Sequence, residues 1–204
     1  MKIYSTKNII KKSFALPLGW ISEDLGGIRV DENLTEYAIS ELDEKFNIQE
    51  VLGEGMWGIA FKIDNNKVLK ITTDIEEVKA SLLIQGTYGP FPKIYEIGGI
   101  DESGDIYIID SVEQNYILYY VVKEIVKPLD GYTLKLIKIW DWHRDEGLEE
   151  QRKLNKDNPE KLNIIQKVED YVYDISNYTL TDCFNENNIG FDEHGNIVCF
   201  DPRT

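Results

Sequence analysis

Residues 47–72 read NIQEVLGEGMWGIAFKIDNNKVLKIT, and this stretch decides the fold class. Apolar and polar residues alternate on both sides of a glycine-rich segment, which is the pattern of half-buried β-strands. The alternation predicts strands over 47–52, 58–63 and 67–72, with a tight turn at 64–66. The stretch therefore reads as a strand, a glycine loop and two further strands.

The glycine loop has the spacing G-x-G-x-x-G-x-A, with glycines at Gly53, Gly55 and Gly58. A plain glycine-rich hairpin turn is one interpretation. In a dinucleotide-binding unit such a loop is followed by a helix, whereas here it is followed by a strand, as in the loop that covers ATP phosphates in kinases. Glycines let the backbone approach phosphates and offer its amides as donors. Trp57 at the tip is suited either to capping a nucleotide or to anchoring a partner or an N-terminal segment.

Lys70 stands between apolar neighbours in the strand 67–72. A buried lysine destabilises a fold unless a carboxylate pairs with it. The next segment, 75–85, reads as a helix, and Glu77 on it is the expected partner, with Glu76 as second choice. The alternative is a lysine that reaches solvent at an edge of the sheet, beside a solvated glutamate.

The rest of the chain separates a β-rich half from a helical half. Further strands are expected over 93–98, 106–109 and 116–126, and helices prevail from Tyr132 onward, most clearly over 161–175. We therefore expect an α+β protein with three parts. These are an N-terminal extension at 1–45 that contains a short amphipathic helix, a β-rich lobe at 46–126 and a helical lobe at 127–204.

The C-terminal segment contains the second chemical signal. Asp182 is followed by Asn187 and Asn188, then by a hairpin that turns at 193–196, then by Asp201. This string resembles the catalytic and metal-binding segments of protein-kinase-like phosphotransferases. It is most similar to the compact kinase-like proteins of phages and bacteria, and with the glycine loop the resemblance covers residues 48 to 204.

The resemblance implies a protein-kinase-like fold that uses ATP and Mg²⁺. Asp182 matches the aspartate that orients the acceptor hydroxyl, and Asp201 matches a magnesium ligand. Asn187 has the family's spacing from Asp182, whereas Asn188 has the family's spacing from Asp201. We favour Asn188 as the second metal ligand because the hairpin fixes its register. In the same scheme Lys70 holds the phosphates.

Residues 121–128 resemble the hinge strand between kinase lobes, in which the backbone of Glu124 and Val126 would pair with the adenine edge. An ordinary core strand is the alternative. A literal His-Arg-Asp at 143–145 is rejected as the catalytic motif, since no asparagine follows it at the family's spacing.

The chain departs from the family in several places. Leu180 and Thr181 replace the His-Arg that precedes the catalytic aspartate, and Pro202 and Arg203 replace the Phe-Gly after Asp201. The resemblance stops before the activation segment and the peptide-binding helices. For Asp182 itself, a helix cap or an Asx turn is the alternative.

The net charge of −15, from 22 basic and 37 acidic residues, disfavours nucleic acids and anionic membranes as partners. Cys183 and Cys199 have no companions that would suggest a zinc site or a disulfide framework, which is typical of a cytoplasmic protein. The sequence thus favours a minimal Ser/Thr protein kinase acting on a protein substrate. The alternatives are a pseudokinase that binds a protein partner, and an acidic inhibitory or structural protein that binds no nucleotide.

Overall fold

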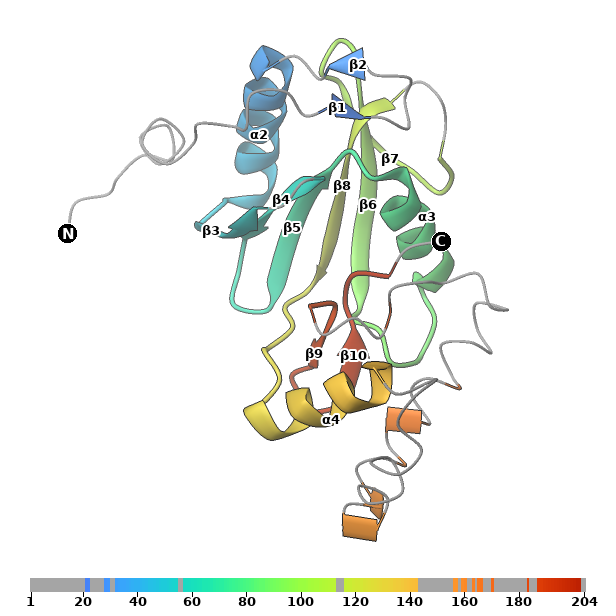
Figure 1. Cartoon of the computed structure of the whole chain (residues 1–204). Helices are drawn as coiled ribbons and strands as arrows, with labels where there is room; N and C mark the ends of the chain where they lie inside the picture. The colour runs from blue at the N-terminus through green and yellow to red at the C-terminus, as the bar shows by residue number, and fades with distance from the viewer. Residues whose placement is uncertain are drawn as a thin grey trace, which may run out of the picture. The chain divides into compact units, whose positions relative to one another are not determined.

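The structure is a computed structural model of the chain. It describes residues 21–22, 28–29, 32–54, 57–112, 116–142, 156–157, 159–160, 163, 165–166, 170, 183 and 187–202. The chain forms two units, of which the first comprises Met1–Val78 with Ile94–Lys123 and the second Lys79–Lys93 with Glu124–Thr204. Figure 1 shows the elements of both, and each unit is described below by itself.

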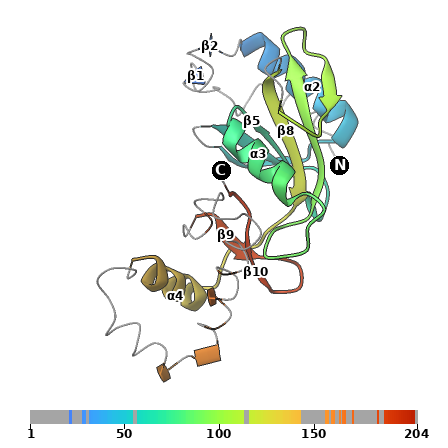
Figure 2. The same cartoon turned by 90° about the vertical axis from the view of Figure 1, so that its right-hand side faces the viewer.

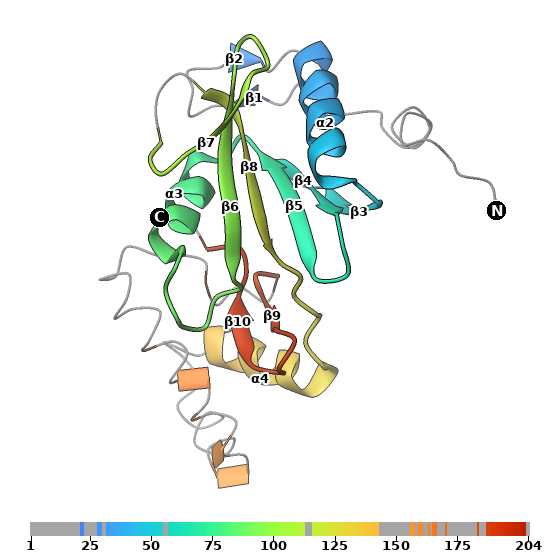
Figure 3. The same cartoon turned by 180° about the vertical axis from the view of Figure 1, so that it is seen from behind.

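A six-stranded sheet with the order β3-β4-β5-β8-β6-β7 dominates the first unit (Figure 3). Its strands are β3 (Glu50–Glu54), β4 (Gly58–Lys62), β5 (Lys67–Thr72), β6 (Ile94–Asp101), β7 (Ile106–Ile108) and β8 (Tyr116–Glu124). The printed pairings β3–β4, β4–β5, β6–β7 and β6–β8 are antiparallel. Two short strands, β1 (Ile21–Ser22) and β2 (Ile28–Arg29), pair separately.

The first strand starts later than the alternation predicted, at Glu50 and not at Asn47. Asn47 has a left-handed backbone with φ of 54°, and its N–H donates to the Asp43 carbonyl at 2.8 Å. Asparagine tolerates this conformation better than most residues. Asn47 therefore ends the preceding helix, and the strand begins only after it.

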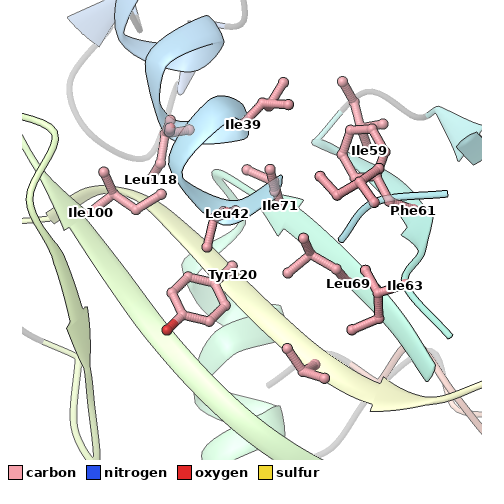
Figure 4. Packing of buried hydrophobic residues seen from close by; sticks show 13 residues of the cluster. Ile39, Leu42, Ile59, Phe61, Ile63, Leu69, Ile71, Ile100, Leu118 and Tyr120 are labelled. Carbon is pink, nitrogen blue, oxygen red and sulfur yellow. The ribbon is translucent and has the colours of Figure 1, made fainter. Parts of the chain in front are cut away.

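That helix, α2 (Glu32–Phe46), is longer than expected and belongs to the core of the sheet. Ala38, Ile39 and Leu42 are buried against one face of the sheet (Figure 4). At the helix end, the Lys45 ammonium pairs with the Glu96 carboxylate, which also accepts a 2.7 Å hydrogen bond from the Tyr120 hydroxyl. Burying each large aliphatic side chain here contributes roughly 1.5–3 kcal/mol, so α2 is part of the folded unit.

The alternation of side chains assigns the two faces of the sheet. The strand residues on the α2 side include Ile59, Phe61, Leu69, Ile71, Leu118, Tyr120 and Val122. Because successive side chains of a strand point to opposite faces, Lys70 and Lys123 lie on the other face. The first turn of helix α3 (Ile75–Ile84) lies on that face, and Figure 2 shows α2 and α3 on opposite sides of β8.

The second unit contains helix α4 (Gly131–Trp142) and a hairpin of β9 (Ile189–Phe191) and β10 (Ile197–Cys199). Ile137 of α4 packs with Ile189, Ile197 and Ile165 in a small core. The hairpin turns where the sequence predicted, with Gly195 at φ of 83°. Most of the helix expected over 161–175 lies outside the described residues. The α+β class is confirmed, since an antiparallel sheet and helices share this chain.

None of the helices that the structure describes is long and apolar enough to cross a membrane.

Candidate functional site

The glycine loop joins β3 to β4 in an antiparallel hairpin, as expected of a loop between two strands. Gly53 is exposed at the end of β3 and Gly58 begins β4, while Gly55 lies outside the described residues. A Cβ atom on Gly58 would lie 2.4 Å from the Ile71 carbonyl oxygen, whereas one on Gly53 would meet no atom within 4 Å. Gly58 is therefore required by the packing of β4 on β5, and Gly53 is not required by packing.

The far end of the loop is fixed by hydrogen bonds to the end of β5. The Trp57 carbonyl accepts from the Thr73 N–H at 2.9 Å and from the Thr72 hydroxyl at 3.0 Å. The Thr72 hydroxyl in turn accepts from the Asp74 N–H at 3.0 Å. Thr72 thus links the glycine loop to the residue at which the next helix begins.

Asp74 caps helix α3 and so places its first turn. Its carboxylate oxygen Oδ1 accepts from the N–H groups of Glu76 at 3.1 Å and Glu77 at 3.4 Å. These donors have no partner within a helix, so an Asp at this position stabilises the helix start. The cap fixes the direction in which the Glu77 side chain leaves the helix.

We expect Asp74→Ala to lower the free energy of unfolding by roughly 1–2 kcal/mol, because it leaves helix donors in a buried region without their acceptor. Urea denaturation followed by circular dichroism measures the change. Asp74→Asn should retain most of the stability, since asparagine is an equally good cap. Asp110→Ala, at an exposed aspartate, is the control. An equal loss for the alanine and asparagine variants of Asp74 would contradict the capping role.

The ion pair predicted between Lys70 and Glu77 is present. The Lys70 ammonium lies 2.7 Å from Oε2 of Glu77, and the side chains are 17% and 2% exposed, respectively. Glu77, and not Glu76, is the partner because its side chain turns inward from the first turn of α3, where it is buried. The pair thus joins β5 to the helix.

A second lysine that sequence reasoning missed reaches the same carboxylate. Lys123, near the end of β8, lies with its ammonium 3.3 Å from Oε1 of Glu77, and its side chain is 8% exposed. The signal was available, since Lys123 follows the apolar run Tyr119–Val122 in a buried strand, as Lys70 follows Val68 and Leu69. Each oxygen of Glu77 therefore has its own ammonium partner.

The hinge candidates Glu124 and Val126 belong to the second unit. The Glu124 N–H donates to the Lys93 carbonyl at 2.9 Å, and its carboxylate accepts from the Lys93 N–H at 3.2 Å. Beyond Val126, Lys127 and Phe191 exchange two main-chain hydrogen bonds of 2.8 Å. A Cβ atom on Gly190 would lie 2.3 Å from a methyl carbon of Val126, so the hinge segment and β9 are closely packed.

The metal candidates Asn188 and Asp201 flank the open end of the β9–β10 hairpin. Ile189 pairs with Cys199, and the Phe200 N–H donates to the Asn188 carbonyl at 2.8 Å. Asn188 is thus held opposite Phe200, next to Asp201 in sequence. Amide and carboxylate oxygens are ligands that Mg²⁺ accepts, usually beside phosphate and water oxygens, so this pair fits part of a magnesium site.

The turn of the hairpin is held by Asp192. Burial raises the pKa of the Asp192 carboxyl, but hydrogen bonds from Asn196 and from the His194 N–H outweigh it and keep that pKa below its usual value. The Asp192 carboxylate accepts from the N–H groups of His194 at 2.9 Å and Asn196 at 2.7 Å. This carboxylate therefore shapes the turn.

Both cysteines are free and buried, which agrees with the absence of a disulfide expected from the sequence. Burial, followed by a hydrogen bond with the neighbouring Cys183, raises the pKa of Cys199 well above its usual value. Asp182, which precedes Cys183, lies outside the described residues, as does the His-Arg-Asp at 143–145. Within the described residues, no group of three or more His, Cys, Asp or Glu side chains is arranged to hold a metal ion.

No family model matches the chain, and no curated protein matches it. Its fold is similar to those of solved aminoglycoside phosphotransferase structures. The streptomycin–ATP ternary complex of APH(2")-IIa has a TM-score of 0.33 and 12% identity, covering 85% of this chain and 72% of that chain. A GDP complex of aminoglycoside 2'-phosphotransferase-IIIa has a TM-score of 0.37 and 13% identity, covering 85% and 73%. At such values the neighbours' reactions do not transfer to this chain, and its function is argued below from its own residues.

Proposed function

We propose that this chain is an ATP- and Mg²⁺-dependent phosphotransferase with a protein-kinase-like fold. The observation that supports this most directly is the buried pair of Lys70 and Glu77, 2.7 Å apart, on the strand and helix that follow the glycine loop. Buried ion pairs contribute little net stability, so stability alone does not account for one here. A lysine held in place by a glutamate is what the phosphates of a bound nucleotide need.

The proposed roles follow the chemistry of phosphoryl transfer, which consists mostly of positioning and charge neutralisation. Backbone amides of the loop at Gly53, Gly55 and Gly58 would donate to the phosphates, and the Lys70 ammonium would hold them. The backbone of Glu124 and Val126 would bind the adenine edge.

Asn188 and Asp201 would hold Mg²⁺, which supplies positive charge to the phosphate oxygens when bound. Asn187 is the alternative to Asn188 for this role. Asp182 would orient the acceptor hydroxyl and accept its proton. The acceptor that we propose is a Ser or Thr hydroxyl of a protein, as in the kinase-like proteins of phages and bacteria.

Calorimetric titration with ATP and Mg²⁺ tests the proposal. We expect the native chain to bind at submillimolar concentration, and Lys70→Met to weaken binding about tenfold or more, because one charge-assisted bond to phosphate is lost. Asp201→Asn should reduce the dependence of binding on Mg²⁺. Lys62→Met, at a more exposed lysine of the same sheet, is the control. Absence of binding by the native chain at millimolar ATP would refute the proposal.

Transfer of labelled γ-phosphate then separates an enzyme from a pseudokinase. Native protein should label a protein acceptor, and Asp182→Ala should lose that activity while retaining ATP binding. Binding without any transfer by the native protein would identify a pseudokinase.

A further inference from the structure

The carboxylate of Glu77 lies between two ammonium groups. Its Oε2 atom is 2.7 Å from Lys70 on β5, and its Oε1 atom is 3.3 Å from Lys123 on β8. These strands are neighbours in the sheet, and both lysines lie on the face of α3. The only assigned partner in the proposed mechanism is Lys70, which leaves Lys123 without a stated role.

The two lysines differ in exposure. The Lys70 side chain is 17% exposed, whereas that of Lys123 is 8% exposed, and Glu77 between them is 2% exposed. Lys70 is therefore the one with access to an incoming ligand. When its ammonium turns toward a phosphate, its bond to Glu77 weakens. A buried carboxylate that loses an ammonium partner is strongly destabilised unless another cation remains close.

We propose that Lys123 is a positioning residue that shares Glu77 with Lys70. Lys123 keeps the Glu77 carboxylate paired and α3 in place while Lys70 binds phosphate. This role rests on the proposed function, because it requires a phosphate for Lys70 to bind. Lys123 acts through Glu77 and does not itself contact the nucleotide.

The pairing has a consequence that is independent of any ligand. Removing either lysine leaves the other ammonium beside Glu77, whereas removing both leaves the buried carboxylate with neither. In thermal unfolding without nucleotide, the Tm loss of Lys70→Met with Lys123→Met should therefore exceed the summed losses of the single variants by about 2 °C or more. Adding Glu77→Gln to the double variant should recover part of this loss, since it removes the buried charge.

The positioning role is measured by ATP–Mg²⁺ titration of variants of Lys123. Lys123→Met should raise the Kd about tenfold, because Lys70 is then the sole ammonium among these two for Glu77 and is less available to phosphate. Lys123→Arg should restore affinity to near the native value. Lys123→Gln, which keeps a hydrogen-bond donor without the charge, should weaken binding as Lys123→Met does and replaces it where that variant fails to fold. Lys62→Met is again the control.

The outcomes separate this inference from the proposed function. Additive Tm losses would overturn the shared carboxylate. Excess loss with unchanged Kd in both Lys123→Met and Lys123→Gln would overturn the positioning role and leave Lys123 as a structural cation. Failure of the native chain to bind ATP would overturn the proposed function together with the positioning role, while the Tm comparison would still report whether Glu77 is shared. Excess loss, weakened binding and rescue by arginine together would support the inference.

Discussion

Glu77→Ala is expected to lower the free energy of unfolding by about 3–5 kcal/mol, the largest effect of any substitution considered for this chain. The change removes the carboxylate that lies 2.7 Å from Lys70 and 3.3 Å from Lys123. Two largely buried ammonium groups then remain on one face of the sheet and repel each other. Urea denaturation of the native and variant proteins measures the loss, provided that the slope of the transition is unchanged.

Glu76→Ala is the matched control, because Glu76 is an acidic residue in the same first turn of α3 and is only partly buried. Removing its charge from the helix start should change stability by roughly 0.3–1 kcal/mol. Similar losses for the two variants would show that Glu77 acts as a helix-end charge, and the shared ion pair would then be unimportant for stability.

The second large effect is expected from Gly58→Ala, which should destabilise the chain by about 1–3 kcal/mol. The new Cβ would lie 2.4 Å from the Ile71 carbonyl oxygen and 3.2 Å from the Thr72 Cα, and both atoms are main chain, so neither can rotate away. The substitution should separate β4 from β5 where Gly58 pairs with Thr72. Thermal unfolding or denaturant titration measures the loss.

Gly53→Ala in the same loop provides the comparison. A Cβ atom there meets no atom within 4 Å, and Gly53 is exposed. Its stability should stay within about 0.5 kcal/mol of the native protein. Equal destabilisation by the two glycine variants would mean that the loop responds to backbone entropy and not to the close approach of β4 and β5.

The hairpin around the glycine loop and the pair of Lys70 with Glu77 were predictable from the sequence. Alternation defined the strands, and the penalty for burying an unpaired lysine indicated that a carboxylate must be near. The same penalty applied to Lys123 but was not used, because its strand was interpreted for its backbone alone. Which face of β8 meets α3 depends on the tertiary fold, and a single sequence does not supply that.

The helix α2 shows a second limit of sequence reasoning. Its amphipathic pattern predicted a short helix in an extension, but Leu42 and Ile39 are buried in the core of the sheet. Which surface an apolar stripe covers depends on contacts between residues far apart in the chain. The roles of Gly55 and Asp182, which lie outside the described residues, remain predictions.

The attachment of β9 to the segment after β8 has a consequence for how such a protein would adapt. Through the paired amides of Lys127 and Phe191 and the missing side chain of Gly190, two stretches more than 60 residues apart in sequence are tied into one piece of backbone. If Val126 reads the base and Asp201 the cation, preference for one cannot be tuned without disturbing the other. Selection for a new nucleotide would then have to act on both stretches together.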